Sequence, residues 1–187
     1  MSDEARAAIT IIGDGPGGLS AALFLAKAGH DVTVFGADET VMHYAYLHNY
    51  LGIEGMSGTD FQRLAREQVV AKGAKLVGEK VSTIEATGDG FTVRSDGGET
   101  RSEYLILSEG NKTPLADNLG LDKADNRVVV DANGRASVSR VYVVGRSVRP
   151  SRSQAIISAG DGAAAALDIL SDIAGKDVQD WDSPPKS

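Results

Sequence analysis

The pattern of apolar and polar positions at the start of the chain predicts alternating strands and helices. Residues 7–12 form a short apolar run that ends in glycines, which is typical of a buried parallel strand. Residues 19–28 place apolar and alanine side chains at helical spacing and stop at Gly29. Residues 31–35 alternate and are β-branched, which predicts a second strand. Together they form a strand–helix–strand unit of about 30 residues.

A second amphipathic helix is predicted over residues 59–71, with Gly73 as its stop and a third strand at residues 74–77. Its apolar face is expected to consist of Phe61, Leu64, Ala65 and Val69.

The pattern then changes to short alternating runs, which lie at residues 80–86, 90–95 and 99–103. Gly-Asp-Gly and Asp-Gly-Gly turns separate them, and such turns predict antiparallel hairpins. Another apolar run, at residues 104–107, resembles a buried strand, and two more apolar runs lie at residues 128–131 and 140–144. Residues 111–127 are polar and indicate a loop, and a last helix is predicted over residues 154–173. The expected fold class is α/β: a Rossmann-like domain with a parallel sheet and an antiparallel β-meander crossover.

The domain organisation follows from length and texture. The chain has 187 residues, and no internal repeat or low-complexity linker divides it. We expect one domain over residues 1–176. Residues 177–187, which contain Trp181 and Pro184-Pro185, are expected to form a flexible C-terminal tail.

Composition and charge exclude several classes of function. The net charge is −7, which disfavours binding to nucleic acid and to anionic membranes. The chain has no cysteine, so dithiol redox chemistry, disulfides and thiolate zinc sites are not expected, and no metal site is predicted. Residues 1–8 lack the features of a secretory signal, and no stretch approaches the roughly 18 apolar residues of a membrane span. The expected location is the cytoplasm.

Gly13, Gly15 and Gly18 satisfy the G-x-G-x-x-G pattern of a dinucleotide-binding turn. The first glycine makes the tight turn out of the strand, the second lets the backbone approach a pyrophosphate, and the third lets the helix pack on the sheet. The turn lies between a predicted strand and a predicted helix, which is the context that this chemistry requires. The alternative is a turn that has lost its ligand.

The end of the second strand departs from the usual dinucleotide pattern. An acidic residue that binds ribose is expected about 20 residues beyond the glycines. Gly36 occupies that place, and Asp38 and Glu39 follow closely. These two carboxylates either substitute for the missing one or are solvated turn residues.

Four segments in the right order resemble the thioredoxin reductase family of pyridine nucleotide-disulfide oxidoreductases. Residues 11–22 are similar to its FAD turn, and residues 48–52 to its acidic-Asn-aromatic-Pro-Gly segment. Residues 107–110 stand where the family has its Ala-Thr-Gly strand end. Residues 141–146, followed by residues 154–164, resemble the closing Gly-Asp strand end and the helix that caps the flavin.

The resemblance implies that FAD is the cofactor of a Rossmann-like FAD-binding domain. It places the pyrophosphate on residues 13–18, the adenine near the backbone of Val81, and the isoalloxazine near Asn49 and the start of the last helix. The residues expected to bind FAD are Gly13, Gly15, Pro16, Gly18, Gly36, Asp38, Glu39, Asn49, Val81, Gly110, Gly145, Arg146, Gln154 and Ala155.

The family's NADPH domain, with its Cys-x-x-Cys, is missing here, because only residues 111–127 connect the two halves. Beside Gly36, two family positions depart: Glu109 replaces a small Thr, and Arg146 replaces an Asp. Arg146 either bonds the pyrophosphate directly or marks a site that is losing its cofactor. Arg149 and Arg152 lie on the same loop, as solvated residues or as part of an anion-facing cluster.

An aromatic and titratable cluster precedes the second helix and consists of His43, Tyr44, Tyr46 and His48. In the family this region borders the flavin, so one interpretation is that a histidine of this chain transfers protons there near neutral pH. The alternatives are ordinary packing or surface placement, and, far less favoured, metal binding by the two histidines. No catalytic residue is assigned.

The sequence favours a small FAD-binding oxidoreductase or electron-transfer flavoprotein without intrinsic disulfide reductase chemistry. Its electron donor is expected to be a redox partner protein or NAD(P)H. The alternatives are a non-catalytic nucleotide-binding or interaction module that has lost redox function, and a subunit that uses the fold to form a homodimer.

Overall fold

The computed structural model describes residues 6–183 and is built on a five-stranded parallel sheet with the order β12-β9-β1-β2-β5. The strands of this sheet are β1 (Ala8–Ile12), β2 (Asp31–Phe35), β5 (Lys75–Val77), β9 (Tyr104–Leu107) and β12 (Val141–Val143). All four residues of β9 and all three of β12 are buried, as expected for parallel strands covered on both faces. The order reverses between β1 and β9, because β2 and β5 follow on one side of β1 while β9 and β12 lie on the other.

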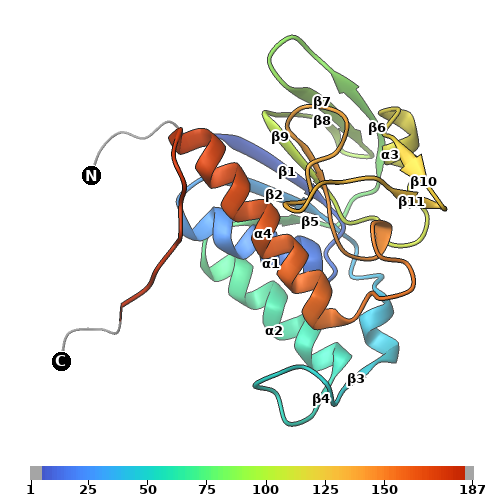
Figure 1. Ribbon diagram of the computed structural model, residues 1–187, viewed down its shortest axis with the longest axis vertical. Helices are drawn as coiled ribbons and strands as arrows, with labels where there is room; N and C mark the ends of the chain where they lie inside the picture. Colours follow the sequence, from blue (N-terminus) through green and yellow to red (C-terminus); the bar gives the residue numbers. More distant parts are fainter. Residues whose placement is uncertain (1–5, 184–187) are drawn as a thin grey trace.

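Three helices cover one face of this sheet: α1 (Pro16–Lys27), α2 (Gly58–Ala71) and α4 (Ala155–Ala174). Figure 1 shows α4 lying across α1, with α2 on the other side of α1. The α1–α4 contact is lined by small side chains, among them the buried Ala21, Ala22, Ala165 and Ala166. Small side chains let the two helix backbones approach closely, which explains why both segments are rich in alanine.

The opposite face carries an antiparallel β-meander of three strands, β6 (Val81–Ala86), β7 (Phe91–Ser95) and β8 (Gly98–Ser102). Ile84, Phe91 and Val93 of the meander pack with Leu105 and Leu107 of the parallel sheet in a second hydrophobic core. The domain therefore has three layers: helices, parallel sheet and meander. The α/β fold class, the parallel sheet and the meander are confirmed.

The predicted apolar face of the second helix is wrong at one position. Leu64 is 43% exposed, whereas Val69 is buried and Ala65 packs partly buried against the core. Gln62, outside the predicted face, is also fully buried, and its side-chain amide donates a hydrogen bond to the carbonyl oxygen of Asp14 at 2.6 Å. The turn after β1 thus gives Gln62 Nε2 a backbone acceptor, whereas Gln62 Oε1 is buried without a hydrogen-bond partner among residues 6–183.

Residues 111–127 are not a plain loop. They contain the short helix α3 (Pro114–Asn118) and β10 (Lys123–Ala124), which pairs with β11 (Arg127–Val128) in a two-stranded hairpin. The apolar run at residues 128–131 contributes no strand to the parallel sheet, and its Val128 is buried in the second core. Its apolar character reflects packing against that core and not a place in the parallel sheet.

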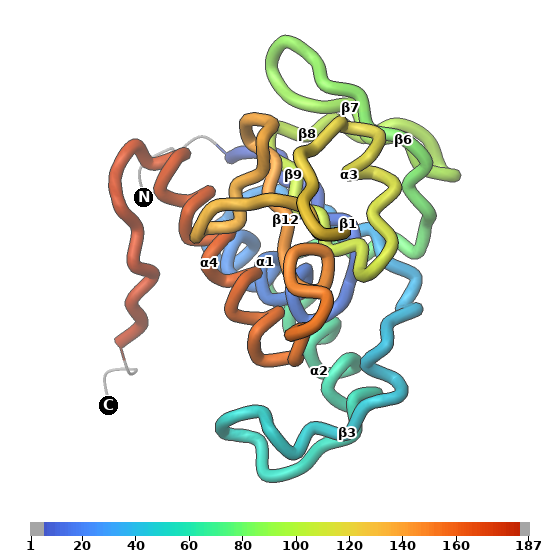
Figure 2. Tube along the Cα trace, turned by 45° about the vertical axis from the view of Figure 1, so that its right-hand side comes forward, coloured from blue at the N-terminus to red at the C-terminus, as the bar shows by residue number. Residues whose placement is uncertain are grey.

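The segment between β2 and α2, residues 36–57, extends away from the body of the domain, as Figure 2 shows around β3, and is called the extended segment below. It contains the 3-10 helix η1 (Val41–Tyr44) and the strands β3 (Tyr46–Leu47) and β4 (Met56–Ser57), which pair with each other. A second 3-10 helix, η2 (Gly145–Ser147), follows β12.

Residues 177–183 have no helix or strand, and they run alongside the helical layer. Lys27 of α1 pairs with Asp180 at 2.9 Å and with Asp182 at 2.6 Å, and Val178 packs against the helical core. Trp181 is 87% exposed. Pro184-Pro185 lies outside the described residues, and the flexibility of the tail stays a prediction.

Within residues 6–183, none of the helices combines the length and apolar character that a transmembrane span requires.

Candidate functional site

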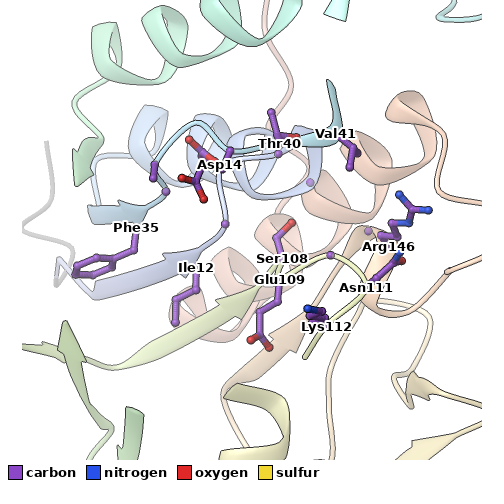
Figure 3. A pocket seen from close by; sticks show the side chains of 18 of the residues that line it. Ile12, Asp14, Phe35, Thr40, Val41, Ser108, Glu109, Asn111, Lys112 and Arg146 are labelled. Carbon is purple, nitrogen blue, oxygen red and sulfur yellow. The ribbon is translucent and has the colours of Figure 1, made fainter. Parts of the chain in front are cut away.

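A cavity of about 880 Å³ lies at the carboxyl ends of the parallel strands. It opens where the strand order reverses, between the ends of β1 and β9, which is where open α/β sheets bind their ligands. Figure 3 shows Asp14 and Phe35 on one side of this cavity and Arg146 with Asn111 on the other. Its size is within the range of roughly 300–1,000 Å³ that is usual for small-molecule and cofactor sites.

The structure places ten of the fourteen predicted site residues in the wall of this cavity. They are Gly13, Gly15, Pro16, Gly36, Glu39, Val81, Gly110, Gly145, Arg146 and Ala155. The other four, Gly18, Asp38, Asn49 and Gln154, do not line it.

The glycine turn connects β1 to α1 and is fixed by the protein itself at two of its glycines. Gly13 has a φ of +101°, and a Cβ atom there would lie 2.2 Å from the carbonyl oxygen of Ser108. A Cβ atom on Gly18 would lie 1.9 Å from the carbonyl oxygen of Gly13. These two positions require glycine for folding, whatever the turn binds.

Gly15 differs, because no atom of residues 6–183 requires a glycine there. Its φ is −72°, which any residue adopts, and the nearest atom to an added Cβ is Thr40 Oγ1 at 3.7 Å, an ordinary contact distance. The space that a side chain would fill at Gly15 belongs to the cavity, at the N-terminal end of α1. The backbone N–H groups of a helix start and its dipole favour an anion at this place.

Arg146 supplies a positive charge on the far side of the cavity. It lies in η2, directly after β12, and is partly buried. Its Nε is buried and has no hydrogen-bond partner within residues 6–183. A buried guanidinium N–H without an acceptor is costly, so this donor points to an acceptor that a ligand provides.

The neighbouring arginines are arranged differently. Arg149 pairs with Asp161 of α4 at 3.1 Å, and neither Arg149 nor Arg152 lines the cavity. Both are exposed. The structure thus favours the solvated interpretation for these two residues and separates them from Arg146.

Asn49 and Gln154 meet although 105 positions separate them in sequence. The side-chain amide of Asn49 donates a hydrogen bond to Gln154 Oε1 at 3.0 Å, which connects the extended segment to the first turn of α4. Asn49 belongs to a shallow depression formed by residues 48–54, beside the large cavity. Ala155, the next residue of α4, lines the cavity itself.

Asp38 does not line the cavity. It has a φ of +61°, and its carboxylate lies 3.1 Å from His43 Nε2. The other ring nitrogen of His43 lies 3.1 Å from Thr59 Oγ1, so this histidine connects the segment before α2 to the start of α2. His43 does not line the cavity. Tyr46 and His48 contact each other with ring centroids 4.6 Å apart. No cluster of three or more metal-ligand side chains is found within residues 6–183.

Sequence reasoning passed over Asp14, the second residue of the glycine turn. It is 5% exposed, forms an ion pair with Arg66 of α2 and lines the cavity. Its carboxylate also accepts a hydrogen bond from the backbone N–H of Asp38 at 3.0 Å. The available signal was a carboxylate between the glycines of a turn that the sequence assigns to an anionic pyrophosphate.

Glu109, which replaces the family's small Thr, caps α3. Its two carboxylate oxygens accept hydrogen bonds from the backbone N–H groups of Leu115 at 3.0 Å and Ala116 at 3.1 Å. Burial raises the pKa of Glu109 above its ordinary value of 4.5, and the two backbone bonds oppose that shift without cancelling it.

We expect Glu109 to make the domain less stable as pH rises above about 4.5. Because the folded-state pKa is raised, the folded chain binds more protons than the unfolded chain at pH values between the unfolded-state pKa and the folded-state pKa. The free energy of unfolding therefore falls as pH rises through this range. Urea unfolding at about pH 4 and about pH 7 should show that Glu109→Gln loses less stability than the wild type over this range. Exposed Glu54 provides the control variant Glu54→Gln. Equal losses in Glu109→Gln and wild type would contradict the expectation.

Comparison with known proteins agrees with this geometry. Residues 7–60, which include the glycine turn, match the family model of pyridine nucleotide-disulphide oxidoreductases. The thioredoxin reductase of Spironucleus barkhanus is 28% identical over 174 residues, which are 90% of this chain and 54% of that protein. The thioredoxin reductase of Streptomyces clavuligerus is 32% identical over 131 residues, 67% of this chain and 39% of that protein.

The fold has a close counterpart among solved structures. A thioredoxin reductase from Gloeobacter violaceus matches with a TM-score of 0.86 and 16% identity, over 95% of this chain and 99% of that chain. The chain spans about half the length of the first of these curated relatives. The predicted resemblance to thioredoxin reductases and the Rossmann-like fold class are both confirmed.

Proposed function

We propose that this chain, similar to thioredoxin reductases over most of its length, binds FAD in the cavity at the end of its parallel sheet and functions as a flavin-dependent oxidoreductase. The residues fit such a group in three places. The glycine turn would hold the pyrophosphate, the wall around Gly36 and Val81 would hold the adenosine, and the start of α4 would face the flavin.

One observation carries the proposal: the cavity joins an open glycine with an unpaired cation. At Gly15 the protein leaves space that its own packing does not demand, and Arg146 buries an N–H donor without an acceptor. An anion between them would account for both. A pyrophosphate supplies the acceptor oxygens that a guanidinium and a helix N-terminus bind.

The start of α4 supports the placement of the flavin. The side chain of Gln154 does not cap this 20-residue helix, so the first backbone N–H groups, at its positive end, stay available to a ligand. FAD, when bound, supplies the site that accepts and donates electrons. The α4 N-terminus favours negative charge, and the Asn49–Gln154 hydrogen bond positions the extended segment against it.

Electrons would have to leave through another molecule. The chain has no cysteine, so it offers no dithiol of its own for a disulfide exchange step. We propose a redox partner protein or NAD(P)H as electron donor. Disulfide reduction by the chain alone is not part of the proposed function.

We expect the purified protein to carry FAD that is not covalently bound. Acid precipitation should release a yellow ligand into the supernatant, where mass spectrometry identifies it as FAD. If the protein is colourless when purified, titration with FAD should restore flavin absorption bands to the protein fraction. A colourless protein that takes up no FAD would refute the proposal and favour a module that has lost redox function.

A further inference from the structure

We propose that Asp14 is the carboxylate that binds the adenosine ribose, in place of the acidic residue that the end of β2 lacks. The inference rests on the proposed function, since it assigns one contact within the same cavity. It differs from the sequence expectation, which gave this role to Asp38 or Glu39.

The space at the end of β2 explains why Gly36 and Asp14 occur together. A Cβ atom on Gly36 would lie 2.3 Å from Asp14 Cγ and 2.7 Å from Asp14 Oδ1. Any side chain at position 36 would therefore have to displace the carboxylate of Asp14. The acidic group usually supplied by the second strand is here supplied by the turn after the first strand, and it occupies the start of the path that the usual side chain would take.

The orientation of Asp14 leaves one oxygen for a ligand. Oδ2 receives both protein partners, the guanidinium of Arg66 and the backbone N–H of Asp38. Oδ1 accepts no hydrogen bond from any residue between positions 6 and 183. The side-chain amide of Gln62 donates a hydrogen bond to the backbone carbonyl oxygen of Asp14 and so holds the backbone of Asp14 in place. A carboxylate fixed in this way binds a hydroxyl without first losing side-chain freedom.

The two competing carboxylates are less suited to the role. Asp38 directs its carboxylate to His43 and does not line the cavity. Glu39 lines the cavity but is exposed, so it must lose rotamer freedom and water before it contacts a ligand. Asp14 is buried and its charge is compensated by Arg66.

This arrangement implies a class of ligand. The free oxygen of a carboxylate accepts a hydrogen bond from a ribose 2′-hydroxyl, and it repels a 2′-phosphate. The site should therefore select adenine dinucleotides with an unmodified ribose, such as FAD, and discriminate against a ligand that lacks the hydroxyl.

The test compares FAD with its 2′-deoxyadenosine analogue by flavin fluorescence titration of the apoprotein. Wild type should bind the analogue about 10- to 100-fold more weakly, as expected when a hydrogen bond to a charged group is lost. Asp14→Ala should bind FAD as weakly as the wild type binds the analogue, and should no longer distinguish the two ligands. Glu67→Ala, on the exposed face of α2, is the control that should keep the full preference.

Because Asp14→Ala leaves Arg66 without its partner, the double variant Asp14→Ala/Arg66→Met is measured as well, with thermal unfolding of every variant. Equal binding of the two ligands by the wild type would overturn the inference while leaving FAD binding intact. Loss of the preference in Glu39→Gln, with the preference kept in Asp14→Ala, would also overturn it. Failure of the wild type to bind either ligand would refute the proposed function together with this inference.

Discussion

Gly15→Val is expected to lower the affinity for FAD by at least about 100-fold while leaving a folded domain. The valine side chain would project into the space that we assign to the pyrophosphate. It would also keep the phosphate oxygens away from the N–H groups at the start of α1. Loss of two charge-assisted hydrogen bonds, worth roughly 1.5–3 kcal/mol each, accounts for an effect of this size.

The folded state should tolerate the same change. Gly15 has a φ of −72° and a ψ of 179°, an extended conformation that valine adopts readily, and Thr40 Oγ1 is the nearest atom at 3.7 Å. Gly15 is the N-cap of α1, where a β-branched residue costs about 1 kcal/mol. The melting temperature should therefore fall by only a few degrees, roughly 3–5 °C.

Two matched variants make the measurement decisive. Gly88→Val lies in the turn between β6 and β7 with no atom within 4 Å of an added Cβ, and should bind FAD normally. Gly18→Val forces a Cβ to within 1.9 Å of a backbone oxygen, and should destabilise the domain itself. Circular dichroism melting and FAD titration of all three variants separate folding from binding. Unchanged FAD affinity in Gly15→Val would show that no phosphate lies at the turn.

Replacing Arg146 should weaken FAD binding by roughly 10- to 150-fold, because its buried Nε has no acceptor of its own in the described chain. Arg146→Ala removes the proposed contact, and Arg146→Asp adds repulsion to that loss. The expected order of affinity is therefore wild type, then Ala, then Asp. The Asp variant also introduces the residue that the resemblance to thioredoxin reductases implied at this position.

The control for Arg146 is Arg149→Ala, because Arg149 lies in the same loop but pairs with Asp161 outside the cavity. Its affinity for FAD should stay within about two-fold of wild type. Titration by flavin fluorescence gives the affinities of all four proteins. Tighter binding by Arg146→Asp than by the wild type would mean that the natural arginine impairs the site instead of holding the phosphate.

Much of the fold could be predicted because it depends on local patterns. The apolar run before Gly13, the helical spacing after it and the short alternating runs each determine one element through burial on one or two faces. Residues 128–131 show what such a pattern leaves open. An apolar run indicates burial but does not say whether the partner is the central sheet or, as for Val128, a neighbouring hairpin.

The site was less predictable because its decisive contacts join distant segments. Position 36 needs a glycine because the carboxylate of Asp14 fills the space of a side chain there. That carboxylate is in turn held by Arg66, which is 52 positions away in sequence. Likewise, Leu64 fits the helical pattern but is exposed, whereas Gln62 is buried and donates to the carbonyl oxygen of Asp14. Spacing within one segment carries no information on such partners, so the motif glycines were found and the acidic residue between them was not.

The position of α4 has a consequence for the order in which the domain forms. Its alanine face covers α1, yet about 130 residues of chain separate the two helices, and β12, the last strand before α4, completes the edge of the sheet beside β9. During synthesis, the face of α1 that α4 covers therefore stays exposed to solvent until α4 has left the ribosome. We expect nascent chains that stop before residue 155 to depend on chaperones, and the final docking of α4 to be the step that commits the domain to its native state.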